Sequence, residues 1–182
     1  MTASPTPSPA TPVPTVHPAT PAAPADGVPA GAEWLRLDRQ ICFSLHAASR
    51  AFNGVYRVVL KDLGLTYPQY LVMLVLWERG DLPVKSLGAH LRLDSGTLSP
   101  LVKRLEAAGL VSRERSTRDE RSVSVRLTAQ GTALRERALE VPRRIAAATG
   151  FGLEEARELR ERLDRLTGAL DAAALEETPG CN

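Results

Sequence analysis

Apolar residues recur at steps of three and four from Glu33 onward, the spacing of one face of an α-helix. This stripe predicts one long helix that begins near Glu33, bends at Asn53-Gly54 and ends at Gly64. Its apolar members are Leu37, Ile41, Leu45, Ala48, Phe52, Val55 and Val59. The segment from Glu33 to Gly64 is therefore expected to be helical.

A second helix is predicted from Thr66 to Gly80. Thr66 and Gln69 have the spacing of a capping box, in which each side chain bonds the backbone N–H near the other. Pro68 falls in the first turn, where its missing N–H costs no hydrogen bond. The residues at the ends of this helix thus predict where it begins and stops.

Two short helices follow, at 84–91 and at about 95–108, and Gly109 is expected to end the second of them. Pro100 conflicts with a regular helix because it removes one backbone hydrogen bond and clashes one turn back. Two solutions remain: the regular helix begins close to Thr97, or it is kinked near its N-terminal end. Either way the order is helix, short turn, helix.

Residues 110–115 and 122–127 alternate between apolar and polar side chains, as strands do, and the polar run 116–121 separates them. They predict a β-hairpin with a charged tip. Thr128 is expected to cap a further helix that reaches about Ala148, with a kink at Pro142, and a last helix then extends to about Leu175. The fold class is therefore mainly α with a small β-hairpin wing, a winged helix-turn-helix.

Composition divides the 182 residues into segments. Residues 1–32 hold nine of the fourteen prolines and only one formal charge, so they are expected to form a disordered tail. An expression tag or a wrongly assigned start codon is the alternative explanation of this segment. Residues 33–178 are predicted to form the winged-helix domain with N- and C-terminal dimerisation helices, and 179–182 a C-terminal tail.

The net charge of +2 excludes a globally basic nucleic-acid-binding protein, so any DNA surface must be local. Residues 103–126 are such a region, with seven basic and four acidic side chains. A helix whose N-terminal end enters the major groove, with an arginine-tipped wing beside it, suits DNA. The alternative is that the hairpin arginines are solvated charges paired with Asp119 and Glu120. The candidate DNA-binding residues are Ser95, Thr97, Ser99, Lys103, Arg104, Arg113, Arg115, Arg118 and Arg121.

The segments Leu93–Glu106 and Arg118–Val123 resemble the recognition helix and wing of MarR-type regulators. The resemblance covers about residues 33–175. It implies a homodimer whose N- and C-terminal helices form the interface and whose lobes bind double-stranded operator DNA. It also implies that Asp94 and Arg121 anchor the helix start and the wing tip.

Within that family, Leu37–Leu45 and Thr66–Tyr70 are similar to the organic-hydroperoxide-sensing branch, the OhrR type. The resemblance implies that Cys42 is the redox-sensing thiol and that Tyr56 and Tyr67 bond its thiolate across the subunit interface. Fourteen residues separate Cys42 from Tyr56, roughly 21 Å along one helix at 1.5 Å per residue, so the two side chains cannot touch within a straight helix. A two-fold axis near the middle of the helix brings them together between subunits.

Two residues keep open roles. His46 stands where this branch often carries a third tyrosine, and it is either a thiolate-bonding cation or an ordinary histidine. Cys181 near the chain end either resolves oxidised Cys42 or is an unrelated thiol, in which case a low-molecular-weight cellular thiol does so.

The leading hypothesis is therefore a cytoplasmic repressor that binds operator DNA when reduced and releases it when organic hydroperoxide oxidises Cys42. The main alternative is a repressor of the same fold that a small aromatic ligand releases, with a non-redox Cys42. A thiol peroxidase is the enzymatic alternative, but no enzyme is expected, because the sequence shows no catalytic triad or nucleotide loop. No cofactor and no membrane span are expected either, and His17 and His90 lack metal-ligand spacing, so no metal is expected.

Overall fold

The computed structural model describes residues 31–115 and 123–176. The chain divides into two units between Ser44 and Leu45. In the first unit, two 3-10 turns, Ala32–Leu35 and Leu37–Arg39, precede the start of helix α1 (Ile41–Val59). The prediction of one helix from Glu33 was wrong. Arg36 and Gln40 are extended, and the Gln40 side-chain amide donates to the carbonyl of Arg36 at 3.3 Å, which stabilises a turn in place of a helix.

The second unit contains the rest of α1, which runs through Asn53-Gly54 without a break, and the helices that surround the core. These helices are α2 (Tyr67–Arg79), α3 (Val84–Leu91), α4 (Ser95–Ala107), α5 (Ala129–Ala138), α6 (Glu140–Thr149) and α7 (Leu153–Glu176). The predicted capping box starts α2, where the Thr66 N–H donates to Gln69 Oε1 at 2.8 Å. Helix α4 continues through Pro100.

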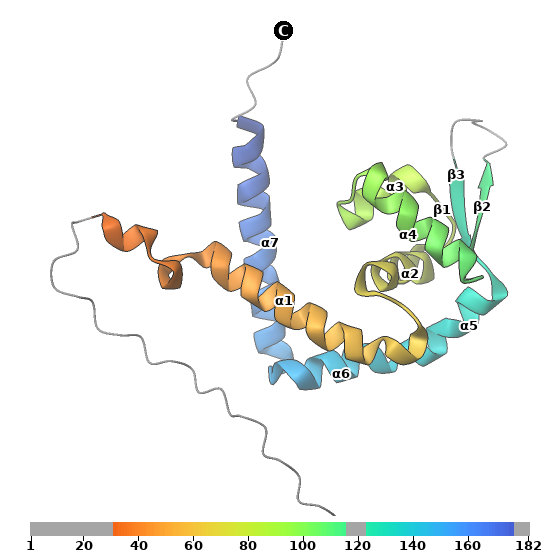
Figure 1. Cartoon of the computed structure of the whole chain (residues 1–182), viewed down its shortest axis with the longest axis horizontal. Helices are drawn as coiled ribbons and strands as arrows, with labels where there is room; N and C mark the ends of the chain where they lie inside the picture. Colours follow the sequence, from red (N-terminus) through yellow and green to blue (C-terminus); the bar gives the residue numbers. More distant parts are fainter. Residues whose placement is uncertain (1–30, 116–122, 177–182) are drawn as a thin grey trace, which may run out of the picture. The chain divides into compact units, whose positions relative to one another are not determined.

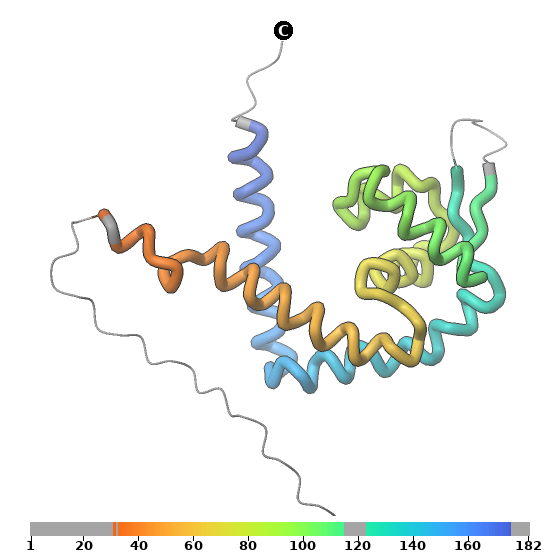
Figure 2. The backbone as a smooth tube through the Cα atoms, viewed as in Figure 1, coloured from red at the N-terminus to blue at the C-terminus, as the bar shows by residue number. Residues whose placement is uncertain are grey.

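The wing is a three-stranded antiparallel sheet in the order β1-β3-β2, formed by β1 (Leu82–Pro83), β2 (Val111–Arg115) and β3 (Val123–Leu127). Strands β2 and β3 run side by side (Figure 2). In their antiparallel register, Arg113 is paired with Val125. Residues 82–83 add a short edge strand that the sequence did not predict. Through this strand, the segment immediately before α3 is hydrogen-bonded to β3 of the hairpin.

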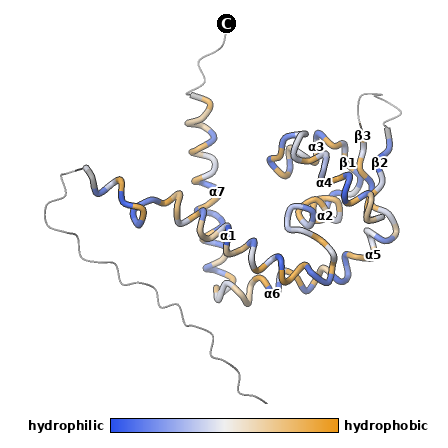
Figure 3. The backbone as a smooth tube through the Cα atoms, viewed as in Figure 1, coloured by the Kyte–Doolittle hydropathy of each residue, from blue (hydrophilic) through white to orange (hydrophobic). Residues whose placement is uncertain are grey.

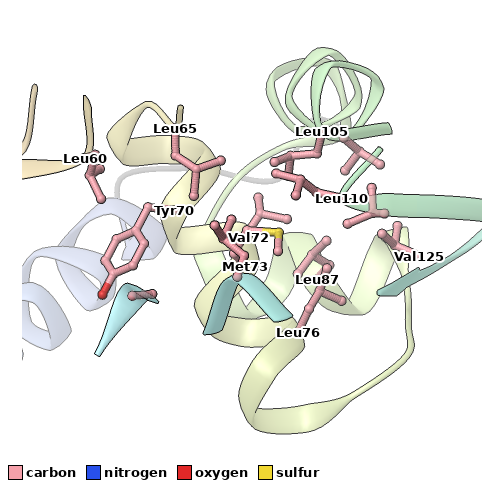
Figure 4. Close-up of a cluster of buried hydrophobic side chains, with 14 of the residues drawn as sticks. Leu60, Leu65, Tyr70, Val72, Met73, Leu76, Leu87, Leu105, Leu110 and Val125 are labelled. Atoms are coloured by element: carbon pink, nitrogen blue, oxygen red, sulfur yellow. The ribbon is translucent and has the colours of Figure 1, made fainter. Parts of the chain in front are cut away.

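One apolar core holds α2, α3, α4, α5 and the base of the wing together (Figure 1). Its fully buried side chains include Leu60, Met73, Leu76, Leu87, Leu98, Leu105 and Val125. Figure 4 shows Met73 and Val72 of α2 between side chains that come from the neighbouring elements. Because the buried side chains of α2 lie within this core, the position of α2 is tied to both helix α4 and the sheet.

The predicted helix from Thr128 to about Ala148 is two helices in the structure. The Thr128 hydroxyl accepts the Gly131 N–H at 3.0 Å and begins α5, as expected for its cap. The chain then passes through Leu139 into α6, which carries Pro142 in its first turn. Across the described residues, no helix is long and apolar enough to cross a lipid bilayer.

Candidate functional site

Asp94 is the N-cap of α4 and fixes the start of this helix. Its Oδ1 accepts the backbone N–H of Thr97 at 2.9 Å, and its Oδ2 accepts the Thr97 hydroxyl at 2.8 Å. These bonds favour the ionised carboxylate and hold the pKa of Asp94 below its usual value. A negative cap beside the positive N-terminal end of α4 therefore secures its first turn.

The turn between α3 and α4 is tight. Arg92 adopts a left-handed conformation, with φ of 55°, a region that residues with a side chain rarely occupy. Its guanidinium forms an ion pair with Asp171 of α7. A Cβ added at Gly88 would lie 2.8 Å from the Leu93 carbonyl oxygen, so only glycine lets the chain cross α3 this closely.

Helix α4 has a buried face and an open face. Leu98, Val102 and Leu105 are at most 1% exposed and hold the helix on the core. The open face, called the recognition face below, consists of the polar candidates Ser95, Thr97, Ser99, Lys103 and Arg104. Ser99 is half-buried and its hydroxyl donates to the Ser95 carbonyl at 2.6 Å, whereas the other four side chains are exposed. The structure thus brings these five candidates together on one helix.

The wing arginines differ in their surroundings. Arg113 forms an ion pair with Glu106 of α4, with a shortest N–O distance of 2.6 Å, and this guanidinium lowers the pKa of the Glu106 carboxyl. Its charge is therefore already partly neutralised. Arg115 ends β2, but its side chain lies outside the described residues, as do Arg118 and Arg121.

Cys42 lies in the first turn of α1, and its side chain is exposed. It belongs to the unit that ends at Ser44, while His46 is exposed in the following turn of the same helix. The other cysteine, Cys181, lies outside the described residues.

Tyr56, Tyr67 and Tyr70 form a group of rings called the tyrosine cluster below. The rings of Tyr56 and Tyr67 stack with centroids 4.2 Å apart, and those of Tyr56 and Tyr70 are 6.1 Å apart. Burial, with the neighbouring phenols, raises the pKa of Tyr56 to about 12. The Tyr56 hydroxyl therefore keeps its proton at neutral pH and can donate a hydrogen bond.

Comparison with known proteins shows to which family the chain belongs. Residues 54–137 match the profile of the family described as "Transcriptional regulator SarA/Rot". The HTH-type transcriptional regulator TtmR of Methylorubrum extorquens is 48% identical over 80% of this chain and 75% of TtmR. The organic hydroperoxide resistance transcriptional regulator of Bacillus subtilis is 43% identical over 75% of this chain and 92% of that protein. This chain belongs to the MarR/SarA family of transcriptional regulators.

Solved structures agree with this assignment. The MarR/SarA regulator superposes on reduced AbfR bound to DNA with a TM-score of 0.65 at 39% identity, over 76% of this chain and 96% of AbfR. For the disulfide form of AbfR, the TM-score is 0.55 at 38% identity, over 79% of this chain and 95% of AbfR. The predicted family and fold class are thus confirmed, and the family consists of transcriptional regulators and not of enzymes.

An apolar cavity of about 490 Å³ adjoins the tyrosine cluster in the MarR/SarA regulator. Tyr56 and Tyr70 form part of its wall, together with Leu74 of α2, Ile145 of α6 and Leu163 of α7. Its lining is predominantly apolar, with Arg160 as a charged member. Among residues 31–115 and 123–176, no group of His, Cys, Asp and Glu side chains is arranged to hold a metal ion.

Sequence reasoning missed two residues of the MarR/SarA regulator that the structure places in these sites. Tyr70 completes the tyrosine cluster, and its position three residues after Tyr67, on the same face of α2, was the available signal. Glu106 binds Arg113 of the wing, and the contact joins residues on two different elements. A local pattern carries no signal for such a pair.

Proposed function

We propose that this regulator is a redox-sensing repressor, which binds operator DNA as a reduced homodimer and releases it when an organic hydroperoxide oxidises Cys42. The observation that carries the proposal is the exposed Cys42 thiol at the start of α1, in a chain 43% identical to a hydroperoxide resistance regulator. A thiol that senses an oxidant must be accessible to it. A regulator of operator DNA acts in the cytoplasm, where the bacterial chromosome lies.

Operator recognition is assigned to the recognition face and the wing. The N-terminal end of α4 enters the major groove, where Ser95, Thr97 and Ser99 reach base edges and phosphates. Lys103 and Arg104 contact the DNA backbone about one turn later. On the wing, Arg115, Arg118 and Arg121 approach the minor groove, while Arg113 braces the hairpin against α4 through Glu106.

A second copy of the chain is the proposed partner of α1 and α7. Polar and apolar residues alternate along α7 (Figure 3), and its apolar side chains at Leu159, Leu163 and Leu170 are exposed in the single chain. Leu35 before α1 is exposed as well. Exposed apolar side chains at helical spacing are typical of an interface between copies, and burying them would stabilise a dimer by the hydrophobic effect.

We expect the reduced protein to sediment at about twice the 19.6 kDa mass of one chain. Sedimentation equilibrium measures this mass without reference to shape, and a dilution series determines the dissociation constant. A species of single-chain mass at the concentrations where operator is bound would contradict the proposed dimer.

The sensing step is a two-electron oxidation. The Cys42 thiolate attacks the terminal oxygen of the hydroperoxide, the O–O bond breaks, and the alkoxide takes a proton from solvent and leaves as the alcohol. Cys42 becomes sulfenic acid, which condenses with a second thiol, forming an S–S bond and releasing water. Tyr56 and Tyr67 of the partner subunit donate hydrogen bonds to the thiolate before oxidation, which favours the reactive form of the sulfur.

Two participants in this step are assigned by chemistry alone. The second thiol is Cys181 of the chain or a low-molecular-weight cellular thiol. His46 follows Cys42 by four residues on α1, and in its cationic form it would favour the thiolate.

The test is a gel-shift titration on the operator with reduced wild-type protein, with and without an organic hydroperoxide. We expect the reduced protein to bind and the treated protein to release the operator, because oxidation changes the hydrogen bonds of Cys42. Binding should return when a dithiol reductant is added, since a sulfenic acid or disulfide is reducible. Operator binding that hydroperoxide does not change would contradict the redox proposal.

The apolar cavity beside the tyrosine cluster supports one alternative inducer, a small aromatic ligand. Its volume of about 490 Å³ lies within the range of small-molecule sites. Release by such a ligand would persist in the presence of excess reductant, whereas release through Cys42 would not. The same gel shift, repeated in reductant, therefore distinguishes the two inducers.

A further inference from the structure

Trp77 connects the tyrosine cluster, at the N-terminal end of α2, to the C-terminal part of the same helix. Its ring meets that of Tyr70 edge-on, with centroids 6.3 Å apart and planes at 66°. Seven residues separate Tyr70 from Trp77, which is about two helical turns, so both lie on one face of α2. Contacts between rings therefore run from Tyr67 and Tyr56 through Tyr70 to Trp77.

From Trp77 the contacts continue to α5. The indole Nε1–H donates to the carbonyl oxygen of Gly131 at 2.9 Å, across 54 positions of sequence. Gly131 lies in the first turn of α5, and its own N–H donates to Thr128 Oγ1 at 3.0 Å. The indole is thus hydrogen-bonded to the end of α5 that follows β3 directly.

The first turn of α5 is in turn fixed to the base of the wing. A Cβ at Gly131 would lie 2.0 Å from the Leu110 carbonyl oxygen, so the backbones of these two residues are in direct contact. The same Leu110 carbonyl accepts the Thr128 N–H at 3.1 Å, and the Thr128 hydroxyl donates to the Gly109 carbonyl at 2.6 Å. Leu110 immediately precedes β2.

From this continuous set of contacts we infer that Trp77 is a positioning residue, which couples the arrangement of the tyrosine cluster to the angle of the wing. The inference rests on the proposed function, because it requires that oxidation of Cys42 rearranges these tyrosines. A shift of Tyr70 changes the surface against which the indole ring packs. The indole then moves the Gly131 carbonyl through their hydrogen bond. Leu110, at the base of the wing, moves as well, because its backbone is in contact with that of Gly131.

A continuous set of contacts transmits a change only if the groups at both ends can each adopt two arrangements. Here these groups are the tyrosine cluster and the wing. Tyr56 and Tyr67 are half-buried, so a new partner at their exposed edges can move them. At the other end, the base of the wing is held by the hydrogen bond from the Thr128 N–H to the Leu110 carbonyl. The tyrosine cluster, proposed to bind Cys42 of the partner subunit, and the wing, proposed to bind DNA, are thereby connected through the indole N–H of Trp77.

The test compares Trp77→Phe with the control Trp34→Phe, whose parent side chain is 77% exposed. Phenylalanine keeps an apolar ring against Tyr70 but lacks the N–H that Gly131 accepts. The operator Kd is measured for reduced and fully oxidised protein, with mass spectrometry confirming equal oxidation of Cys42. The ratio of the two Kd values is the readout, because it measures coupling and not stability.

We expect the ratio to fall by about tenfold in Trp77→Phe, within the range typical of coupled sites, with little change in the reduced Kd. The Trp34→Phe control keeps the wild-type ratio. A Trp77→Phe protein that loses affinity equally in both redox states overturns the inference and leaves Trp77 a packing residue. Wild-type protein that does not release DNA on oxidation contradicts the proposed function instead, and the inference with it.

A second measurement applies even where Trp77→Phe folds poorly. The chain has two tryptophans, so Trp34→Phe leaves Trp77 as the sole indole reporter. Its fluorescence is recorded without DNA before and after stoichiometric hydroperoxide, in this variant and in Trp34→Phe combined with Cys42→Ser. A change in emission that requires Cys42 supports the coupling. Emission that stays the same after full oxidation overturns it.

Discussion

Replacement of Cys42 by serine is expected to leave operator binding by the reduced protein intact and to abolish release by organic hydroperoxide. The side chain of Cys42 is exposed, so the exchange of sulfur for oxygen removes little packing. A serine hydroxyl is not deprotonated at neutral pH and does not attack the O–O bond as a thiolate does. Gel-shift titrations of wild type and variant, each with and without hydroperoxide, measure the effect.

The matched control is Cys181→Ser, which removes the other thiol of the chain. It should still release the operator, either normally when a small thiol completes the reaction or after formation of a stable sulfenic acid. If Cys42→Ser protein still released operator on treatment, the sensing thiol would be elsewhere and the mechanism above would fail. Loss of release in both variants would identify Cys181 as the resolving thiol.

Gly131→Ala is expected to destabilise the protein by about 3 kcal/mol or more, at the upper end for an overpacked site. The new Cβ would lie 2.0 Å from the Leu110 carbonyl oxygen and 3.3 Å from Leu127 Cδ2. The closer neighbour is backbone and cannot turn aside, so α5 and the wing base must separate. The free energy of unfolding from urea titration, followed by circular dichroism, gives the size of the effect.

Gly168→Ala is the control, because this glycine lies inside α7 with no atom within 4 Å of an added Cβ. An alanine there restricts the unfolded chain and should stabilise the helix by roughly 0.5–1 kcal/mol. Equal stability of Gly131→Ala and wild type would show that the α5–Leu110 contact yields easily. It would also weaken the case for a rigid connection between Trp77 and the wing.

Local signals in the sequence predicted the elements whose ends are defined by neighbouring side chains. The Thr66 and Gln69 pair predicted the start of α2, and Thr128 predicted the start of α5, because each cap acts within three residues. The apolar stripe before Ile41 predicted a helix where the structure has two 3-10 turns, for a related reason. Apolar spacing cannot reveal that the Gln40 side chain turns back to bond a backbone carbonyl.

Contacts between distant segments could not be predicted. Two residues, Leu82 and Pro83, are too few to show a strand period, so β1 was missed. The Arg113 to Glu106 ion pair and the Trp77 to Gly131 hydrogen bond both depend on packing that only the folded chain has. In contrast, the clustering of polar candidates on α4 follows from helical spacing alone, and sequence was sufficient there.

The edges of the wing sheet bear on how concentrated this protein can become before it aggregates. An open strand edge can pair with the same edge of another molecule and seed a growing sheet. Here β1 spans only two residues, and Pro83 has no N–H to offer a further strand. The opposite edge, β2, carries the charged side chains of Arg113 and Glu114, which are held in ion pairs. Neither edge is a good template, so the wings of neighbouring molecules should not pair into a common sheet even at high protein concentration.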